Sequence, residues 1–151
     1  MPPEQARAYY MEQVKRSASW FYLIAGLSIV NSLLQFAGVQ FTLTVGLGYT
    51  QIVDAFTQLD YGVAPSTALF VDVLIAGLFA AFGYFGRNGI RRIFIVGMAL
   101  YAFDGLFFLA TGAIFSVLIH GVVLFQLYKG VQALGSVDKV DSLVKKDMMP
   151  Y

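Results

Sequence analysis

The only histidine of this 151-residue chain and two of its aspartates interrupt long apolar runs, where ionisable side chains are rare. These residues are Asp72, Asp104 and His120. An Asp at the centre of a membrane-spanning helix costs roughly 2.5–3.5 kcal/mol on insertion scales, so we expect these residues to have a function. An imidazole next to carboxylates can bind a proton or a cation, and the three groups together could be ligands of a divalent metal ion.

The spacing of these residues predicts that they lie at one depth. Asp104 and His120 are each eight residues from Gly112, and Asp72 and Asp104 are each sixteen residues from Asn88. Gly112 and Asn88 lie in short turn sequences between apolar runs, which predicts two tight antiparallel hairpins. Residues at equal distances from such a turn are level, because every helical residue advances the chain by the same ~1.5 Å. We therefore expect Asp104 and His120 to be in contact, directly or through one water or ion.

Polar or small residues share a helix face with each ionisable residue. Asn31, seven residues before Gly38, supplies a polar group at the same predicted depth from the first apolar run. Spacings of three or four residues place further polar side chains beside these groups, which predicts helix faces turned towards the protein interior. The predicted binding site comprises Asn31, Gln35, Asp72, Tyr101, Asp104, Ser116 and His120, and the candidate ligands of a divalent metal ion are Asp72, Asp104 and His120.

A structural role is the alternative for this cluster, because hydrogen bonds between helices could fix the packing without binding anything. Such bonds contribute on average only about 0.6 kcal/mol in measured membrane proteins, less than the cost of inserting the aspartates. Stability alone is therefore a poor explanation for two buried Asp residues, while specificity of packing stays an open alternative.

The composition indicates a membrane protein. Apolar residues make up 58% of the chain and charged residues 13%, whereas a soluble domain has about 25% charged residues. The absence of cysteine excludes disulfides and thiol redox chemistry, and the net charge of +1 gives no reason to expect nucleic acid as a partner. The lipid bilayer is the expected partner of the apolar surface.

Four apolar runs predict four membrane-spanning helices, since a span needs about 20 apolar residues. We expect an all-α integral membrane protein, a four-transmembrane-helix bundle with an interfacial or re-entrant outer helix between the first and second spans. Residues 1–17 are predicted to form a cytoplasmic lead helix, and residues 134–151 a cytoplasmic tail. The membrane domain at 18–133 is divided into spans 18–38, 66–86, 90–110 and 113–130 and an outer segment at 39–65.

Basic residues lie on only one side of this arrangement. The stretch 39–68, which connects the first two spans, contains no Lys or Arg. Since cytoplasmic loops collect basic residues, both termini are predicted to be cytoplasmic, in the inner (plasma) membrane of a bacterium. The ten basic residues that define this topology are Arg7, Lys15, Arg16, Arg87, Arg91, Arg92, Lys129, Lys139, Lys145 and Lys146.

No motif in the chain predicts an enzyme. There is no His-Glu-x-x-His sequence of a zinc protease, and the residues around Asp72 and Asp104 differ from those of intramembrane aspartyl proteases. We expect a small polytopic membrane protein whose buried polar site near the outer face binds a proton, ion or small ligand, in transport or sensing. The alternative is a non-catalytic structural or accessory subunit, assembled into a homo-oligomer or a larger membrane complex.

Overall fold

The computed structural model describes residues 1–39, residue 48 and residues 64–148. All regular secondary structure within these residues is α-helical. The predicted outer segment falls largely on residues 40–47 and 49–63, so its expected helix lies outside the described residues. The helices are α1 (Pro3–Phe36), α3 (Pro65–Arg87), α4 (Arg91–Ala110) and α5 (Ile114–Asp147).

All four helices are long and apolar enough to cross a membrane, as the four predicted spans require. Their outward faces agree with this, because Phe103, Phe115 and Leu118 are each more than 60% exposed (65%, 66% and 62%). Large apolar side chains exposed in such numbers would form an aggregation-prone surface in water but suit lipid.

Similar backbone turns end α3 and α4. After α3, the N–H of Gly89 binds the carbonyl of Gly86 over 3.0 Å, and the N–H of Ile90 binds that of Phe85 over 3.3 Å. Gly89 has a φ of 83°, a left-handed conformation that glycine adopts without steric cost. Gly112, with a φ of 74°, closes α4 in the same way. The expected turns between α3 and α4 and between α4 and α5 are therefore both present.

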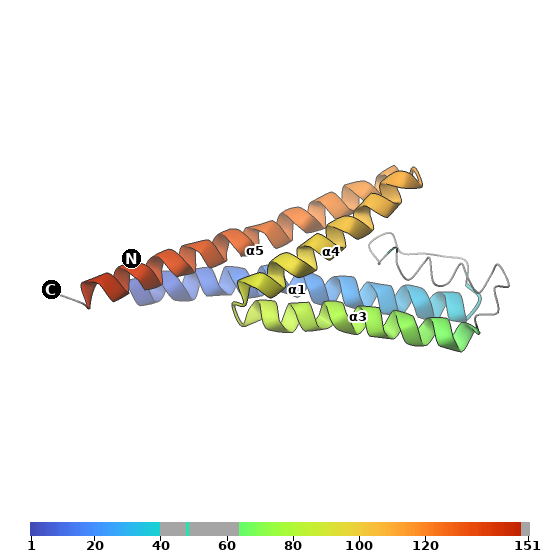
Figure 1. Cartoon of the computed structure of the whole chain (residues 1–151), viewed down its shortest axis with the longest axis horizontal. Coiled ribbons are helices and arrows are strands. Elements are labelled where there is room, and N and C mark those ends of the chain that lie inside the picture. The colour runs from blue at the N-terminus through green and yellow to red at the C-terminus, as the bar shows by residue number, and fades with distance from the viewer. Residues whose placement is uncertain (40–47, 49–63, 149–151) are drawn as a thin grey trace.

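Two of the helices are much longer than a membrane span. α1 and α5 each contain 34 residues, so the predicted lead helix 1–17 is continuous with the first span, and most of the tail 134–151 is continuous with the last. No residue between 4 and 36 is a proline, and the polar residues of the lead are compatible with a helix, so nothing interrupts it. Figure 1 shows both termini at one end, where α1 and α5 project side by side past the α3–α4 turn. We call this end the proximal end and the other the distal end.

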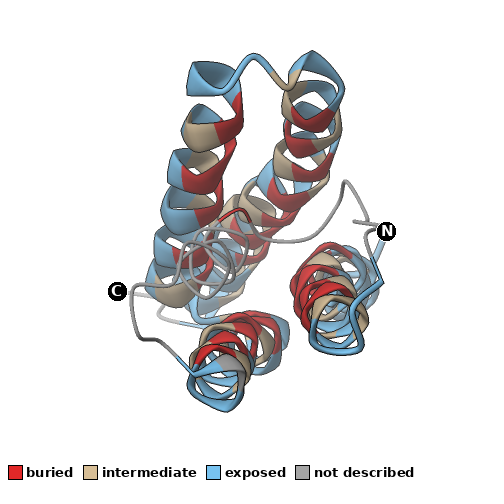
Figure 2. Cartoon of the chain, turned by 90° about the vertical axis from the view of Figure 1, so that its right-hand side faces the viewer, coloured by how far each residue is buried: buried red, intermediate tan, exposed pale blue. Residues whose placement is uncertain are grey.

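The helices pack as two pairs that diverge. α1 contacts both α3 and α5, and α4 contacts α5, whereas α3 and α4 share the fewest contacts of these neighbours. Figure 1 shows the α4–α5 pair separating from the α1–α3 pair towards the distal end. The predicted tight hairpin thus describes α4 and α5 well, whereas α3 and α4 meet mainly near their turn. In Figure 2, seen from the distal end, the buried face of each helix turns towards the other helices.

An aromatic core joins the two pairs. The ring of Phe21 lies 5.4 Å from that of Phe94 and 6.0 Å from that of Phe82, measured between centroids. Glycines make room for these rings: a Cβ atom on Gly97 would lie 2.8 Å from the Phe21 ring, and one on Gly130 would overlap Phe94. This close packing holds α4 and α5 against α1 and so fixes the polar residues that follow along both helices.

Candidate functional site

The centre of the site is a contact between Asp104 of α4 and His120 of α5. The Nε2 atom of His120 lies 3.0 Å from Oδ2 of Asp104, and the two side chains are 2% and 0% exposed. The expected contact is thus present and direct. It arises because α4 and α5 run antiparallel on either side of Gly112, and both residues are buried between the helices.

The contact made by Nδ1, the other ring nitrogen of His120, indicates which nitrogen is protonated in the neutral imidazole. Nδ1 lies 2.8 Å from the backbone carbonyl oxygen of Ser116, one turn earlier in α5. A carbonyl oxygen can only accept, so this contact is a hydrogen bond only when Nδ1 has a proton and donates it. Ser116 therefore contributes to the site through its backbone, and the tautomer of His120 is set by its own helix.

The contact between His120 and Asp104 is a hydrogen bond only if the pair holds one further proton. With Nδ1 already protonated, a bare Nε2 would direct its lone pair at a carboxylate oxygen 3.0 Å away, which is repulsive. The contact is attractive when Nε2 is protonated, as an imidazolium–carboxylate pair, and also when Oδ2 is protonated, as a neutral imidazole and a carboxylic acid. Both arrangements hold the same proton and have no net charge, which suits a fully buried position.

Two rings of α4 enclose the imidazole. Tyr101 stacks on His120 with a centroid distance of 4.4 Å and an interplanar angle of 12°, and Phe108 approaches it at 5.1 Å. These residues precede and follow Asp104 by about one helical turn, so all three lie on one face of α4. Gly105 allows the approach, because a Cβ atom there would be 3.3 Å from His120.

The hydroxyl of Tyr101 is a polar group of the site that stands without a hydrogen bond in the described part of the chain. It is buried and has no hydrogen-bond partner among the residues that the structure describes. Buried hydroxyls nearly always have a partner, so this one is an exception. The prediction of Tyr101 as a site residue is consistent with this placement.

A backbone group completes the surroundings of Asp104. The N–H of Gly48, which is buried, donates to Oδ2 of Asp104 over 2.9 Å. A Cβ atom on Gly48 would lie 2.9 Å from the Phe108 ring and 3.0 Å from that of Phe107, so a side chain there would press on the site. Sequence reasoning missed Gly48, since no motif indicates a single peptide N–H. Phe108 could have been found from its four-residue spacing to Asp104.

The remaining predicted residues lie on the other helix pair. Asn31 of α1 and Asp72 of α3 are buried, 2% and 1% exposed, and Gln35 is half-buried. Their inward orientation was expected. No group of three or more metal-ligating side chains occurs within the described parts of the chain. The predicted metal site at Asp72, Asp104 and His120 therefore gains no support from these residues.

Comparison with known proteins gives no further guide to this site. No protein-family model, no curated protein and no solved structure shows a significant match to the chain. Any function must therefore be argued from the geometry itself.

Proposed function

We propose that this chain is an inner-membrane protein of a bacterium that binds one proton at Asp104 and His120, in transport or sensing. The observation behind the proposal is the bonding of His120, with Nδ1 2.8 Å from a carbonyl oxygen and Nε2 3.0 Å from a carboxylate oxygen. That pattern requires one proton between two buried groups that can each accept it. Intramembrane ionisable residues commonly mark proton pathways, which supports this interpretation.

A proton suits the Asp104–His120 pair better than a metal ion or a larger ligand. Oδ2 of Asp104 already receives the N–H of Gly48 and faces His120, and the imidazole is enclosed by Tyr101 and Phe108. A cation bound at Nε2 would have to displace the short contact to Asp104. A proton requires no such displacement, because it fits within the existing 3.0 Å separation.

Loss of the shared proton would destabilise the packing of α4 on α5. The deprotonated pair would have a net charge of −1 in a buried position, and the lone pair of Nε2 would face the carboxylate. Either water or a counter-charge must then enter, or α4 and α5 must shift. Proton binding at this point therefore stabilises the packing of α4 on α5, as a transport cycle or a pH sensor requires.

The orientation of the protein in the membrane determines which membrane face the site lies nearer to. The ten basic residues lie in the proximal half of α1, around the α3–α4 turn and in α5 from Lys129, near its middle, towards the proximal end. By the positive-inside rule, this end and both termini are cytoplasmic. The Asp104–His120 pair, eight residues from Gly112, then lies roughly 12 Å below the outer end of the bundle at ~1.5 Å per residue.

A difference proton titration of the purified protein in detergent tests the proposal. The comparison is between the wild type and the double variant Asp104→Asn, His120→Gln, with helix content and gel-filtration volume as checks of folding. We expect the wild type to release the one shared proton that the variant lacks. Titration curves that superimpose would favour the alternative, a pair that only fixes the packing of a structural or accessory subunit.

A further inference from the structure

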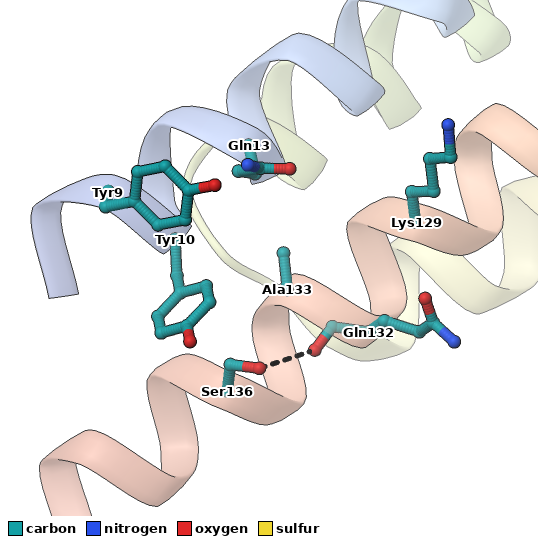
Figure 3. Close-up of a pocket in the computed structure, with 7 residues that line it drawn as sticks. All are labelled: Tyr9, Tyr10, Gln13, Lys129, Gln132, Ala133 and Ser136. Carbon is teal, nitrogen blue, oxygen red and sulfur yellow. Dashed lines mark hydrogen bonds between the residues drawn. The ribbon is translucent and has the colours of Figure 1, made fainter. Parts of the chain in front are cut away.

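A second feature lies at the proximal end, between α1 and α5, far from the Asp104–His120 pair. It is a pocket of about 250 Å³ that opens between the two helices. Figure 3 shows the side chains that surround it, three from α1 and four from α5. They are Tyr9, Tyr10, Gln13, Lys129, Gln132, Ala133 and Ser136.

The pocket coincides with the boundary of the membrane. Gly130 packs against Ser17, so Lys129 is level with the start of the apolar part of α1. From Lys129 to Ser136 the helix advances roughly 10 Å at ~1.5 Å per residue. The polar headgroup layer on each side of a bilayer is about 5–8 Å thick, so the pocket spans this layer.

The pocket faces outwards and not towards the α3–α4 turn. Met11 and Leu134 are the side chains that meet Gly89 in that turn, at 3.7 and 3.8 Å from the position of a Cβ atom there. The pocket residues Gln13 and Gln132 are two positions away from Met11 and Leu134. A step of two residues turns an α-helix by about 200°, so their side chains point to nearly the opposite side. A molecule from the surrounding headgroup layer can therefore enter directly.

The lining of the pocket suits an anionic headgroup. Its lining residues include one cation, Lys129, together with two tyrosines and two glutamines, and none of them is acidic. Lys129 forms no ion pair with any carboxylate in the part of the chain that the structure describes, although Arg7 and Arg91 both do. The Ser136 hydroxyl already donates to the Gln132 carbonyl, as the dashed line in Figure 3 shows.

Lys129 also connects the pocket to the apolar surface. Its ammonium lies 4.7 Å from the centroid of the Phe125 ring, and Phe125 is 59% exposed one turn closer to the membrane centre. A ligand with a phosphate at Lys129 could therefore extend polar groups into the pocket and acyl chains along Phe125. We propose that the pocket binds the headgroup of an anionic phospholipid, a function separate from proton binding at Asp104 and His120.

Native mass spectrometry of the intact protein in detergent tests this proposal with phosphatidylglycerol as the probe. Phosphatidylcholine is the zwitterionic comparison, and inorganic phosphate is the competitor that represents a free anion. We expect phosphatidylglycerol to be retained in preference to phosphatidylcholine and to resist displacement by phosphate. Equal retention of the two lipids would overturn the proposal, and so would ready displacement by phosphate, which would indicate a site for the free anion.

Substitutions locate the binding. Lys129→Gln is expected to weaken phosphatidylglycerol binding about fivefold, the usual contribution of one basic residue at an anionic membrane surface. Lys139→Gln is the matched control, because it removes the same charge from an exposed position of α5 outside the pocket. Gln132→Glu, also at an exposed position, should weaken binding further by repulsion. Equal effects of Lys129→Gln and Lys139→Gln would contradict the assignment. Asp104→Asn should leave lipid binding unchanged, which separates this test from that of the proton site.

Discussion

The peptide N–H of Gly48 and the Nε2 atom of His120 meet at the same oxygen, Oδ2 of Asp104, at 2.9 Å and 3.0 Å. Gly48 belongs to the connection between α1 and α3, whereas Asp104 and His120 belong to α4 and α5. The buried carboxyl group is thus positioned by three parts of the chain. A carboxyl oxygen can satisfy both neighbours at once, since it can accept from Gly48 and either accept from His120 or, when protonated, donate to it.

The first prediction follows from this shared oxygen. In Asp104→Asn, the atom at the position of Oδ2 is either an amide oxygen or an amide nitrogen. A nitrogen there leaves the Gly48 N–H unpaired, and an oxygen requires His120 to be charged without a counter-ion. We expect a loss of about 1–3 kcal/mol for Asp104→Asn, which leaves one buried group unsatisfied, and a larger loss for Asp104→Ala, which leaves both the Gly48 N–H and His120 without a partner at this position. Thermal or denaturant unfolding in detergent measures both, and an Asn variant as unstable as the Ala variant would argue against the shared oxygen.

Gly48 itself supplies the second prediction. Gly48→Ala places a methyl group 2.9 Å from the Phe108 ring, which packs on His120, so the ring or the backbone must move. We expect a loss of about 1–3 kcal/mol in the free energy of unfolding, typical of overpacking. The matched control is Gly77→Ala on α3, where nothing lies within 4 Å of the new methyl group. That change should be neutral or stabilising by up to about 1 kcal/mol, since alanine favours the helix.

Much of this arrangement could be predicted from the sequence because it depends on the number of residues between the polar side chains and the turns. Asp104 and His120 are level because each is eight residues from Gly112, and the turn at Gly112 fixes the register of α4 on α5. The four spans follow from apolar run lengths alone. Residue spacing along a hairpin is insensitive to the details of packing, so these expectations transferred directly to the structure.

Other features depend on tertiary packing and could not be predicted from residue spacing. Asp72 and Asp104 are equally far from Asn88, but α3 and α4 diverge beyond their turn, so a shared depth does not bring them into one metal site. The divergence reflects the packing of α3 on α1 and of α4 on α5. The partner of Asp104 at Gly48 is a backbone group, and a backbone group has no signature in the sequence.

The third prediction concerns the Tyr101 hydroxyl, which is buried without a partner among the described residues. Tyr101→Phe keeps the ring that stacks on His120 and removes only this oxygen. We expect stability to be unchanged or raised by up to about 1 kcal/mol, because an unsatisfied polar group is lost. A loss of more than ~1 kcal/mol would mean that the hydroxyl binds a structural water or another group. Thermal unfolding of the variant, with Tyr22→Phe as a control at a half-buried tyrosine, decides between these outcomes.

The fourth prediction is the topology. Reporter fusions at Arg87 and Tyr151 should both report the cytoplasm, and a fusion at Tyr61 should report the outside, because all basic residues then lie on one side. A cytoplasmic signal at Tyr61 would place an additional crossing between residues 39 and 61. It would also reverse the side of the membrane from which a proton reaches Asp104 and His120.

The central claim is that one proton is shared between Nε2 of His120 and Oδ2 of Asp104, with a second proton fixed on Nδ1. Because the chain has a single histidine, ¹⁵N-histidine labelling gives one pair of ring signals that needs no assignment. The Asp104 carboxyl carbon is identified by its absence from the Asp104→Asn spectrum. At neutral pH we predict a protonated Nδ1, together with either a protonated Nε2 and an ionised Asp104 or a bare Nε2 and a protonated Asp104. An unprotonated Nδ1, or a bare Nε2 beside an ionised Asp104, would contradict the account.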